Sequence, residues 1–296
     1  MLEKPKISDV AILFAIAFFW GSAFSFIEIA LRDVTPITLA AARITIGALF
    51  LYAVVKWRGH RMPTDYVNWH DMTIAGLSGN AVPFVLIAWG QQYVDSSLTA
   101  ILIAIVPLST LFFAHIFTHD EKITSPRLIG FLMGVFGLIA LSMGEDFSHL
   151  DASGAGIIAI TLATLGYGYA GIHLRKLRHL PSSVCAAGLL ITSAIATIPL
   201  AFMLEAPLAL TPSNTTLLSL LYLGIFPSGV AIILVSKLVF RMGATFAALN
   251  NYISPLFGVA IGVLLLGEQM TQHMIIAIIL ILSGIAITRI KPRAKQ

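Results

Sequence analysis

The sequence contains little charge and almost no cysteine. Only 11% of its 296 residues are Asp, Glu, Lys or Arg, whereas a soluble domain carries about 25%. Hydrophobic residues make up 58%, and the mean hydropathy is +0.92. A soluble fold of this size could not bury so much apolar surface, so lipid surrounds most of the chain. The single Cys185 lies in an apolar run, which excludes a disulfide framework and a cysteine-based metal site.

Long apolar runs fill the chain and leave no room for a soluble domain. A spanning helix needs about 20 mostly apolar residues, and the connections between the runs are short. The predicted fold class is therefore an all-α polytopic membrane protein with ten transmembrane helices. The expected spans are roughly 10–31, 37–56, 72–92, 96–117, 127–144, 154–175, 182–204, 215–238, 244–266 and 273–290.

The basic residues are distributed unevenly between the connections. Under alternating topology, every Lys and Arg outside the spans except Arg32 falls on one side, and Arg43 lies inside the second span. Connections on the far side carry acids such as Asp33, Asp95 and Glu268. The positive-inside rule then predicts cytoplasmic N- and C-termini. The net charge of +4 is thus a topology signal, and we expect no nucleic-acid partner.

The two halves of the sequence resemble each other. The segment "RDVTPITLAAARITIGALF" from Arg32 aligns with "RHLPSSVCAAGLLITSAIA" from Arg178, and "VPLSTLFFAHIFTHDEKIT" aligns with "SPLFGVAIGVLLLGEQMT". Each half contains five spans, and an odd number makes the second copy enter the membrane from the opposite face. We therefore predict a first repeat over 1–148 and an inverted repeat over 149–296. Secondary transporters have this architecture, bind substrate at the repeat interface, and work by alternating access.

Four motifs carry a resemblance to a known family. They are "WGSAF" in the first span, "PITLAAARITIGALFL" in the second, "IVPLSTLFFAHIFTHDEKIT" across the fourth and fifth, and "ISPLFGVAIGVLLLGEQMT" across the ninth and tenth. In this order they resemble the EamA family of the drug/metabolite transporter superfamily, in particular its YddG-type aromatic amino acid exporters. The resemblance implies an exporter of amino acids or other small metabolites in a bacterial-type inner membrane. Many relatives carry a lysine near Glu28, so their charge-based substrate rules do not transfer to this sequence.

A G-x-G-x-x-G pattern occurs in the sixth span, at Gly166, Gly168 and Gly171. A dinucleotide-binding fingerprint follows a strand, opens a helix and is followed by an acid about 20 residues later. None of these conditions is met here. Small residues in a spanning helix instead let neighbouring backbones approach. Gly166 and Gly168 point to different sides of a helix, which favours a helix wedged between two partners.

Prolines interrupt the third, fourth, eighth and ninth spans at Pro83, Pro107, Pro227 and Pro255. Each proline removes one N–H donor and frees the carbonyl four residues earlier. Such sites normally face protein or a water-filled cavity, because a freed carbonyl in lipid is costly. Corresponding interruptions in two repeats indicate the binding region of a transporter. The alternative is that these prolines only kink packed helices.

Uncharged polar and aromatic residues at similar depth are the candidate substrate contacts. We expect them to line one cavity, although each could also serve helix packing alone. No Asp, Glu, Lys or Arg is expected at the middle of any span, so the predicted substrate is neutral or zwitterionic, such as an aromatic amino acid or a lipophilic drug. The candidates are Trp20, Phe24, Asn80, Phe84, Tyr167, Ser228, Asn250, Asn251 and Ser254.

Three ionisable residues inside spans are candidates for gating. Glu28 lies near the outer end of the first span, and Arg43 could extend outward to pair with it. The alternative is that both reach the headgroups separately. His173 aligns with Glu28 in the repeat and lies near the opposite face, where it is either a gate residue that titrates near neutral pH or a plain interfacial residue. Facilitated diffusion and proton antiport both remain open.

Other function classes lack support in the sequence. An intramembrane enzyme would need a reactive constellation, and no G-x-S-x-G, H-E-x-x-H or Walker loop is present. A lipid flippase or a structural membrane protein remains a minor alternative. We expect no metal, no cofactor and no obligatory protein partner, so the expected partners are the lipid bilayer and a small-molecule substrate.

Overall fold

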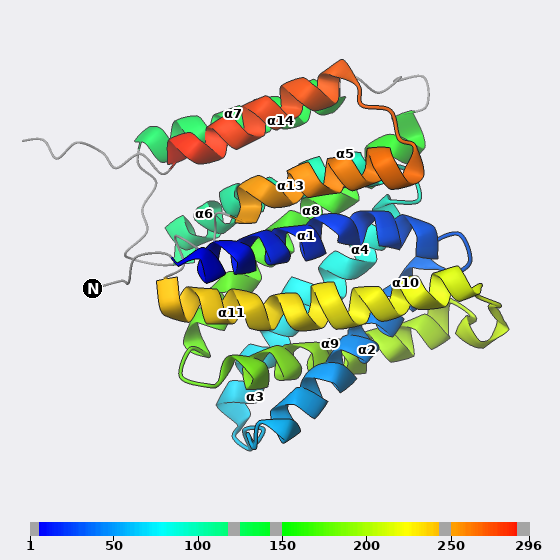
Figure 1. Cartoon of the computed structure of the whole chain (residues 1–296), viewed down its shortest axis with the longest axis vertical. Helices are drawn as coiled ribbons and strands as arrows, with labels where there is room; N and C mark the ends of the chain where they lie inside the picture. Colours follow the sequence, from blue (N-terminus) through cyan, green and yellow to red (C-terminus); the bar gives the residue numbers. More distant parts are fainter. Residues whose placement is uncertain (1–5, 118–124, 143–149, 243–249, 289–296) are drawn as a thin grey trace, which may run out of the picture.

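The computed structural model describes residues 6–117, 125–142, 150–242 and 250–288. Over these ranges the regular elements are all helices, arranged as a bundle of long rods (Figure 1). Six are long and apolar enough to cross a bilayer, and four shorter apolar helices occur at the remaining predicted spans. The predicted all-α polytopic fold class is confirmed.

Each expected span corresponds to one helix or to a run of consecutive helical segments. A short 3₁₀ turn, η3 (Pro207–Ala209), lies in one connection. In chain order the segments are α1 (Ile7–Ala30); α2 (Pro36–Trp57); α3 (Tyr66–Gly76), η1 (Leu77–Ala81) and α4 (Val82–Gly90); α5 (Ser96–Ile103) and α6 (Val106–Phe117); α7 (Ser125–Ser142); α8 (Leu150–Lys176); α9 (Ser182–Leu204); α10 (Asn214–Ile225), η4 (Phe226–Val230) and α11 (Ala231–Met242); α13 (Asn250–Ile261) and η5 (Gly262–Leu266); and α14 (Gln272–Thr288).

Of the spans that contain Pro83, Pro107, Pro227 and Pro255, three are interrupted close to the proline. The third and eighth spans, which are repeat mates, contain the π-helical turns η1 and η4, next to Pro83 and at Pro227. The fourth span breaks between α5 and α6, just before Pro107. Pro255 differs, because α13 continues through it as a regular helix. Backbone irregularity therefore recurs at matching places in the two halves, as π-turns often do at functional sites.

Packing between the helices follows the predicted repeat. Helix α2 packs against its mate α9, and α7 packs against its mate α14 (Figure 1). The contact of α1 with α13 is matched by the contact of α8 with α6. In these pairs, each helix meets the repeat mate of the helix that its own mate meets. The boundary between repeats, at 148/149, lies outside the described residues and stays a prediction.

Hydrogen bonds between connections show that the two halves run in opposite senses. At the end of α1, Asp33 accepts hydrogen bonds from the backbone and side chain of Ser213, just before α10. Helix α8, the mate of α1, ends at the other face, where Lys176 contacts Asp71 of α3. We call the side with connections 31–35, 91–95, 205–213 and 267–271 the acidic face, and the side with 58–65 and 177–181 the basic face.

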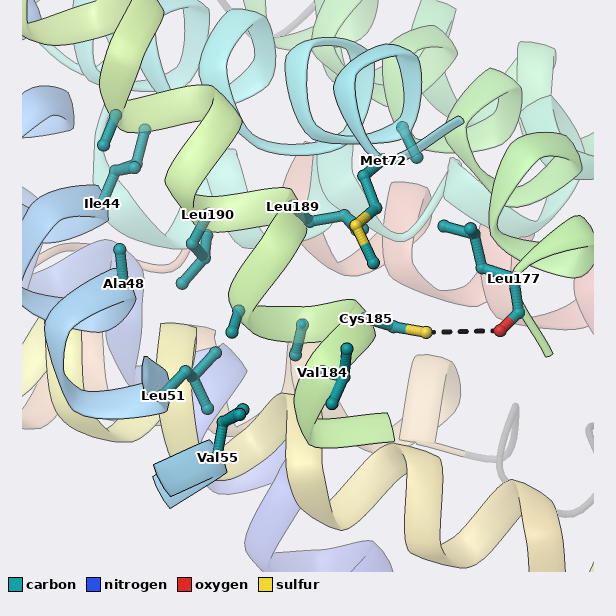
Figure 2. Packing of buried hydrophobic residues seen from close by; sticks show 14 of the residues in the cluster. Ile44, Ala48, Leu51, Val55, Met72, Leu177, Val184, Cys185, Leu189 and Leu190 are labelled. Atoms are coloured by element: carbon teal, nitrogen blue, oxygen red, sulfur yellow. Dashed lines mark hydrogen bonds between the residues drawn. The ribbon is translucent and has the colours of Figure 1, made fainter. Parts of the chain in front are cut away.

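The largest apolar core cluster holds α2, α3 and α9 together across the two halves. Figure 2 shows Leu51 of α2, Met72 of α3 and Leu190 of α9 in one packed layer, and each is fully buried. Cys185 lies in the same layer, and its thiol donates a 3.3 Å hydrogen bond to the carbonyl of Leu177. The lone cysteine is thus a packing residue with a satisfied donor.

The glycines of α8 contact two different neighbours, as their spacing predicts. A Cβ at Gly166 would lie 2.5 Å from the carbonyl oxygen of Ser78 in η1. A Cβ at Gly168 would lie 2.8 Å from the backbone of Ser109 in α6. Nothing lies within 4 Å of such an atom at Gly171. Helix α8 is therefore wedged between the third and fourth spans, with glycine at both close approaches.

We expect Gly168→Ala to destabilise the protein and Gly171→Ala to leave its stability unchanged or raise it. The first substitution forces α6 outward at a cost of roughly 1–3 kcal/mol, more than the helix propensity that alanine gains, about 1 kcal/mol. The unfolding temperature of the purified protein in detergent measures both. Equal unfolding temperatures for the two variants would contradict the close packing of α8 against α6.

Candidate functional site

A central cavity of about 450 Å³ lies between the two halves. This volume falls within the roughly 300–1,000 Å³ of small-molecule sites. The wall is mostly apolar, with a few polar side chains pointing inward. Its lining residues are Trp20, Ala23, Phe24, Ile27, Arg43, Gly79, Asn80, Phe84, Ile87, Ala100, Ile103, Ala104, Val106, Tyr167, Pro227, Ile232, Val235, Asn250, Ser254 and Pro255.

Most of the predicted substrate contacts meet at this cavity. Ser228 is buried but does not line it, and the side chain of Asn251 lies outside the described part of the structure. The sequence thus predicted which residues share one chamber, whereas their contact with substrate stays a prediction. The candidates that line the cavity are Trp20, Phe24, Asn80, Phe84, Tyr167, Asn250 and Ser254.

Trp20 connects the halves across the cavity wall. Its indole N–H donates a 3.1 Å hydrogen bond to the carbonyl of Pro227, inside the π-turn η4. A tryptophan at this depth differs from the interfacial belt tryptophans of membrane proteins. The hydrogen bond fixes the ring, which presents its apolar surface to the chamber.

The prolines leave fewer unpaired backbone carbonyls in the cavity than their spacing predicts. Pro227 and Pro255 line the chamber, while Pro83 and Pro107 are not among its lining residues. The carbonyl of Leu223, which Pro227 deprives of its donor, accepts a 2.9 Å hydrogen bond from the hydroxyl of Ser228. This freed carbonyl is therefore repaired locally and is not available to a ligand.

Arg43 corrects the prediction that no charge lies in the middle of the protein. Its guanidinium lines the cavity, with Cζ 3.9 Å from the centre of the Phe84 ring and Nη2 donating a 3.2 Å hydrogen bond to Ser228. The side chain is only 5% exposed. The expectation that it extends outward is wrong, because a cation–π contact and a hydroxyl hold it toward the inside.

The suggested Glu28–Arg43 ion pair is also wrong. Glu28 accepts a 3.1 Å hydrogen bond from the backbone N–H of Ser96, which also donates to Glu268 at 2.9 Å. The two carboxyl groups therefore share one donor at the start of α5. Glu28 belongs to the acidic face, whereas Arg43 belongs to the cavity.

Three acids of the acidic face each cap a helix of the opposite half. Glu268 accepts from the backbone and hydroxyl of Ser96 and Ser97 at the start of α5. Glu205 likewise caps α2, accepting from the backbone N–H of Thr38 at 2.7 Å. Asp33 holds the start of α10 through Ser213. A carboxylate at a helix N-terminus satisfies free N–H donors and favours the helix dipole.

These caps join the two halves and determine the charge state of the acids. Burial raises the pKa of Glu268, but hydrogen bonds from Ser96 and Ser97 outweigh it and hold the pKa below its usual range. Hydrogen bonds from Ser213 and Thr216 lower the pKa of Asp33 to about 2. Both acids are therefore ionised at neutral pH, and their hydrogen bonds join the two halves at the acidic face.

His173 lies in an ionic cluster near the basic face. Its Nδ1 is 2.7 Å from Asp71 of α3, and the ammonium of Lys176 is 3.3 Å from the same carboxylate. The ring is buried, so His173 is not a plain interfacial residue exposed to headgroups. A gating role for this cluster stays a prediction. Sequence reasoning missed Asp71, which lies one residue before the expected third span and inside the observed helix α3.

Comparisons with known proteins agree with this architecture. The model of the EamA-like transporter family matches the chain twice, over residues 8–143 and 154–290. The chain belongs to this family. Each match covers one of the two halves that pack symmetrically around the cavity.

Curated relatives of this EamA-like protein carry transporter names. It is 22% identical to the uncharacterized transporter YoaV of Bacillus subtilis, over 92% of this chain and 94% of the relative. It is 26% identical to the uncharacterized inner membrane transporter YedA of Escherichia coli, over 88% and 83%. A solved crystal structure superposes with a TM-score of 0.70 at 19% identity, over 96% of this chain and 98% of the other. A multi-pass membrane transporter fits all of these findings.

The cap at Asp33 generates a prediction about pH. Because its folded-state pKa, about 2, lies below the value of 3.8 in the absence of the cap, its contribution to stability is present above about pH 4 and disappears as the pH falls through about 2. We expect Asp33→Asn to lower the unfolding temperature at neutral pH, and this difference from wild type to vanish toward pH 2. A constant difference at all pH values would contradict the charged cap.

Proposed function

We propose that this EamA-like transporter exports small amphipathic metabolites, foremost aromatic amino acids, by alternating access through the central cavity. The observation that carries this proposal is the position of the cavity, whose wall takes residues from both halves of an inverted pair. Two antiparallel copies can adopt two related arrangements, each open to one face.

The proposed direction of transport follows from the difference between the two faces. At the acidic face, helix caps join the two halves, as between Thr35 and Glu205. By the positive-inside rule the basic face, which carries Arg58, Arg61 and Arg178, is cytoplasmic. The termini then lie in the cytoplasm of a bacterial-type cell, and the acidic face, where the caps join the halves, points outward. Export requires the caps to break once substrate has entered from the cytoplasmic side.

The lining favours an aromatic body. Trp20, Phe24, Phe84 and Tyr167 surround the chamber, and offset or edge contacts between rings are favourable. A lipophilic drug would also fit these rings, which makes drug export the alternative. The polar lining favours an amino acid, because Asn80, at 6% exposure, offers an amide inside an otherwise apolar wall.

Transport by purified protein tests the proposal. Proteoliposomes preloaded with unlabelled phenylalanine should show saturable counterflow of labelled phenylalanine. In a panel of neutral, cationic and anionic metabolites and drugs, small amphipathic aromatic compounds should compete best with the labelled phenylalanine. Saturable transport of lipophilic drugs alone would favour the alternative. No saturable transport of any compound in the panel would contradict the transporter proposal.

We expect Trp20→Ala to lower transport at least about tenfold, since a lost contact of roughly 1.4 kcal/mol corresponds to tenfold in affinity. The matched control is Trp57→Ala, because Trp57 is 85% exposed at the end of α2 and far from the chamber. Counterflow rates in proteoliposomes, normalised to protein, measure the effect. Equal losses in both variants would show that Trp20 has no special role in transport.

A further inference from the structure

The cavity contains one cation, and no described residue neutralises it. Arg43 is the only Asp, Glu, Lys or Arg among the described residues that line the chamber. Within the described ranges, no carboxylate lies at ion-pair distance from its guanidinium. Its Nε is buried and has no hydrogen-bond partner. A buried donor of this kind is rare in native structures and requires an explanation.

The contacts of Arg43 orient its side chain but do not satisfy all of its hydrogen-bond donors. Ser228 donates its own proton to the carbonyl of Leu223, so its oxygen is left to accept from Nη2 of Arg43. Phe84 supports the plane of the guanidinium at 3.9 Å. These two contacts hold the fork in place and leave the buried Nε–H with no acceptor among the described residues. A planar guanidinium held in this manner matches a carboxylate, which can accept two parallel hydrogen bonds.

We propose that Arg43 binds the carboxylate of the transported molecule. The inference rests on the proposed transport through this cavity and narrows its substrates to carboxylate-bearing amphipathic molecules. The apolar body then lies against the neighbouring rings of Phe24 and Phe84. For an amino acid, the ammonium group is received by uncharged oxygens such as the Ser254 hydroxyl, which is buried and has no partner in the described structure.

Because no described residue acts as a counter-ion to Arg43, the site favours carboxylates over amines. A carboxylate that enters the chamber neutralises a charge that is otherwise buried beside the Phe84 ring and the hydroxyls of Ser228 and Tyr167, with no carboxylate among the described lining residues. An amine without a carboxylate would place a second positive charge in the same chamber, where like charges repel strongly in a low dielectric. The same site therefore attracts acids and excludes simple cations.

Matched ligands test the assignment on the wild-type protein. The probes are L-phenylalanine and 3-phenylpropanoate, which have a carboxylate, and L-phenylalaninamide and phenethylamine, which lack one; leucine and leucinamide repeat the comparison with another body. Binding is measured as the ligand-induced rise in the unfolding temperature of the full chain in detergent. We expect a rise with the acids and none with the amides or amines. Equal rises for an acid and its amide, or no rise with any acid, would overturn the assignment.

Substitutions test the residue itself. Arg43→Gln should weaken the binding of acids at least about tenfold, which is 1.4 kcal/mol. Arg43→Lys keeps the charge but loses the planar fork, so its affinity for acids should lie between those of the wild type and Arg43→Gln. Arg32→Gln is the matched control, because it removes an exposed arginine from the acidic face. The unfolding temperature without ligand checks that each variant is folded. Wild-type affinity for acids in folded Arg43→Gln would refute the role of Arg43.

The outcome for this inference is separable from that of the transport proposal. Saturable uptake of phenylalaninamide that is insensitive to Arg43→Gln would refute carboxylate binding and leave alternating-access transport standing. Absence of saturable uptake of every probe, with acids still raising the unfolding temperature through Arg43, would leave the binding site standing and refute transport.

Discussion

The need to satisfy every backbone polar group inside lipid is the constraint on which this structure depends. Helices meet it over most of the chain, and the exceptions are confined to a few places. The π-turns η1 and η4 and the break before Pro107 all occur at the depth of the central chamber. Where Pro227 removes a donor, Ser228 replaces it. These three irregular segments border the chamber, and they come from both halves of the chain.

The same constraint explains how the two halves are joined at the acidic face. Helix N-termini expose N–H groups that need acceptors, and on this face the acceptors come from the opposite half, as with Glu205 at α2 and Glu268 at α5. The two halves are therefore joined through bonds that each helix requires for its own stability. Such caps are local and polar, so water can replace them when the face opens. The apolar layer around Leu51, Met72 and Leu190 (Figure 2) has no such substitute and holds the halves together between states.

Much of the fold could be predicted from sequence because its signals are strong and local. The lengths of the apolar runs predicted the membrane spans, and the spacing of the glycines indicated that α8 is wedged between two neighbours. Proline spacing located the chamber, and most of the nominated lining residues meet there. The errors concern charged side chains. A long side chain reaches about as far inward as outward, so the position of Arg43 in α2 could not determine its direction. Pairings such as Glu28 with Ser96, or Asp71 with His173, join distant segments and depend on how the halves meet.

The direction of Arg43 changes how the chamber should be understood. An uncharged pocket would accept any flat molecule of suitable size, and selectivity would rest on shape alone. A fixed guanidinium over Phe84 gives the chamber a charged end, and aromatic side chains line the remainder. Because the described residues supply no counter-ion there, the energetic cost of burying the cation is present in the empty state, and a ligand of opposite charge relieves it under the proposed assignment. That assignment links binding to closure, since a chamber holding a neutralised arginine can exclude water at lower cost than one holding a bare charge.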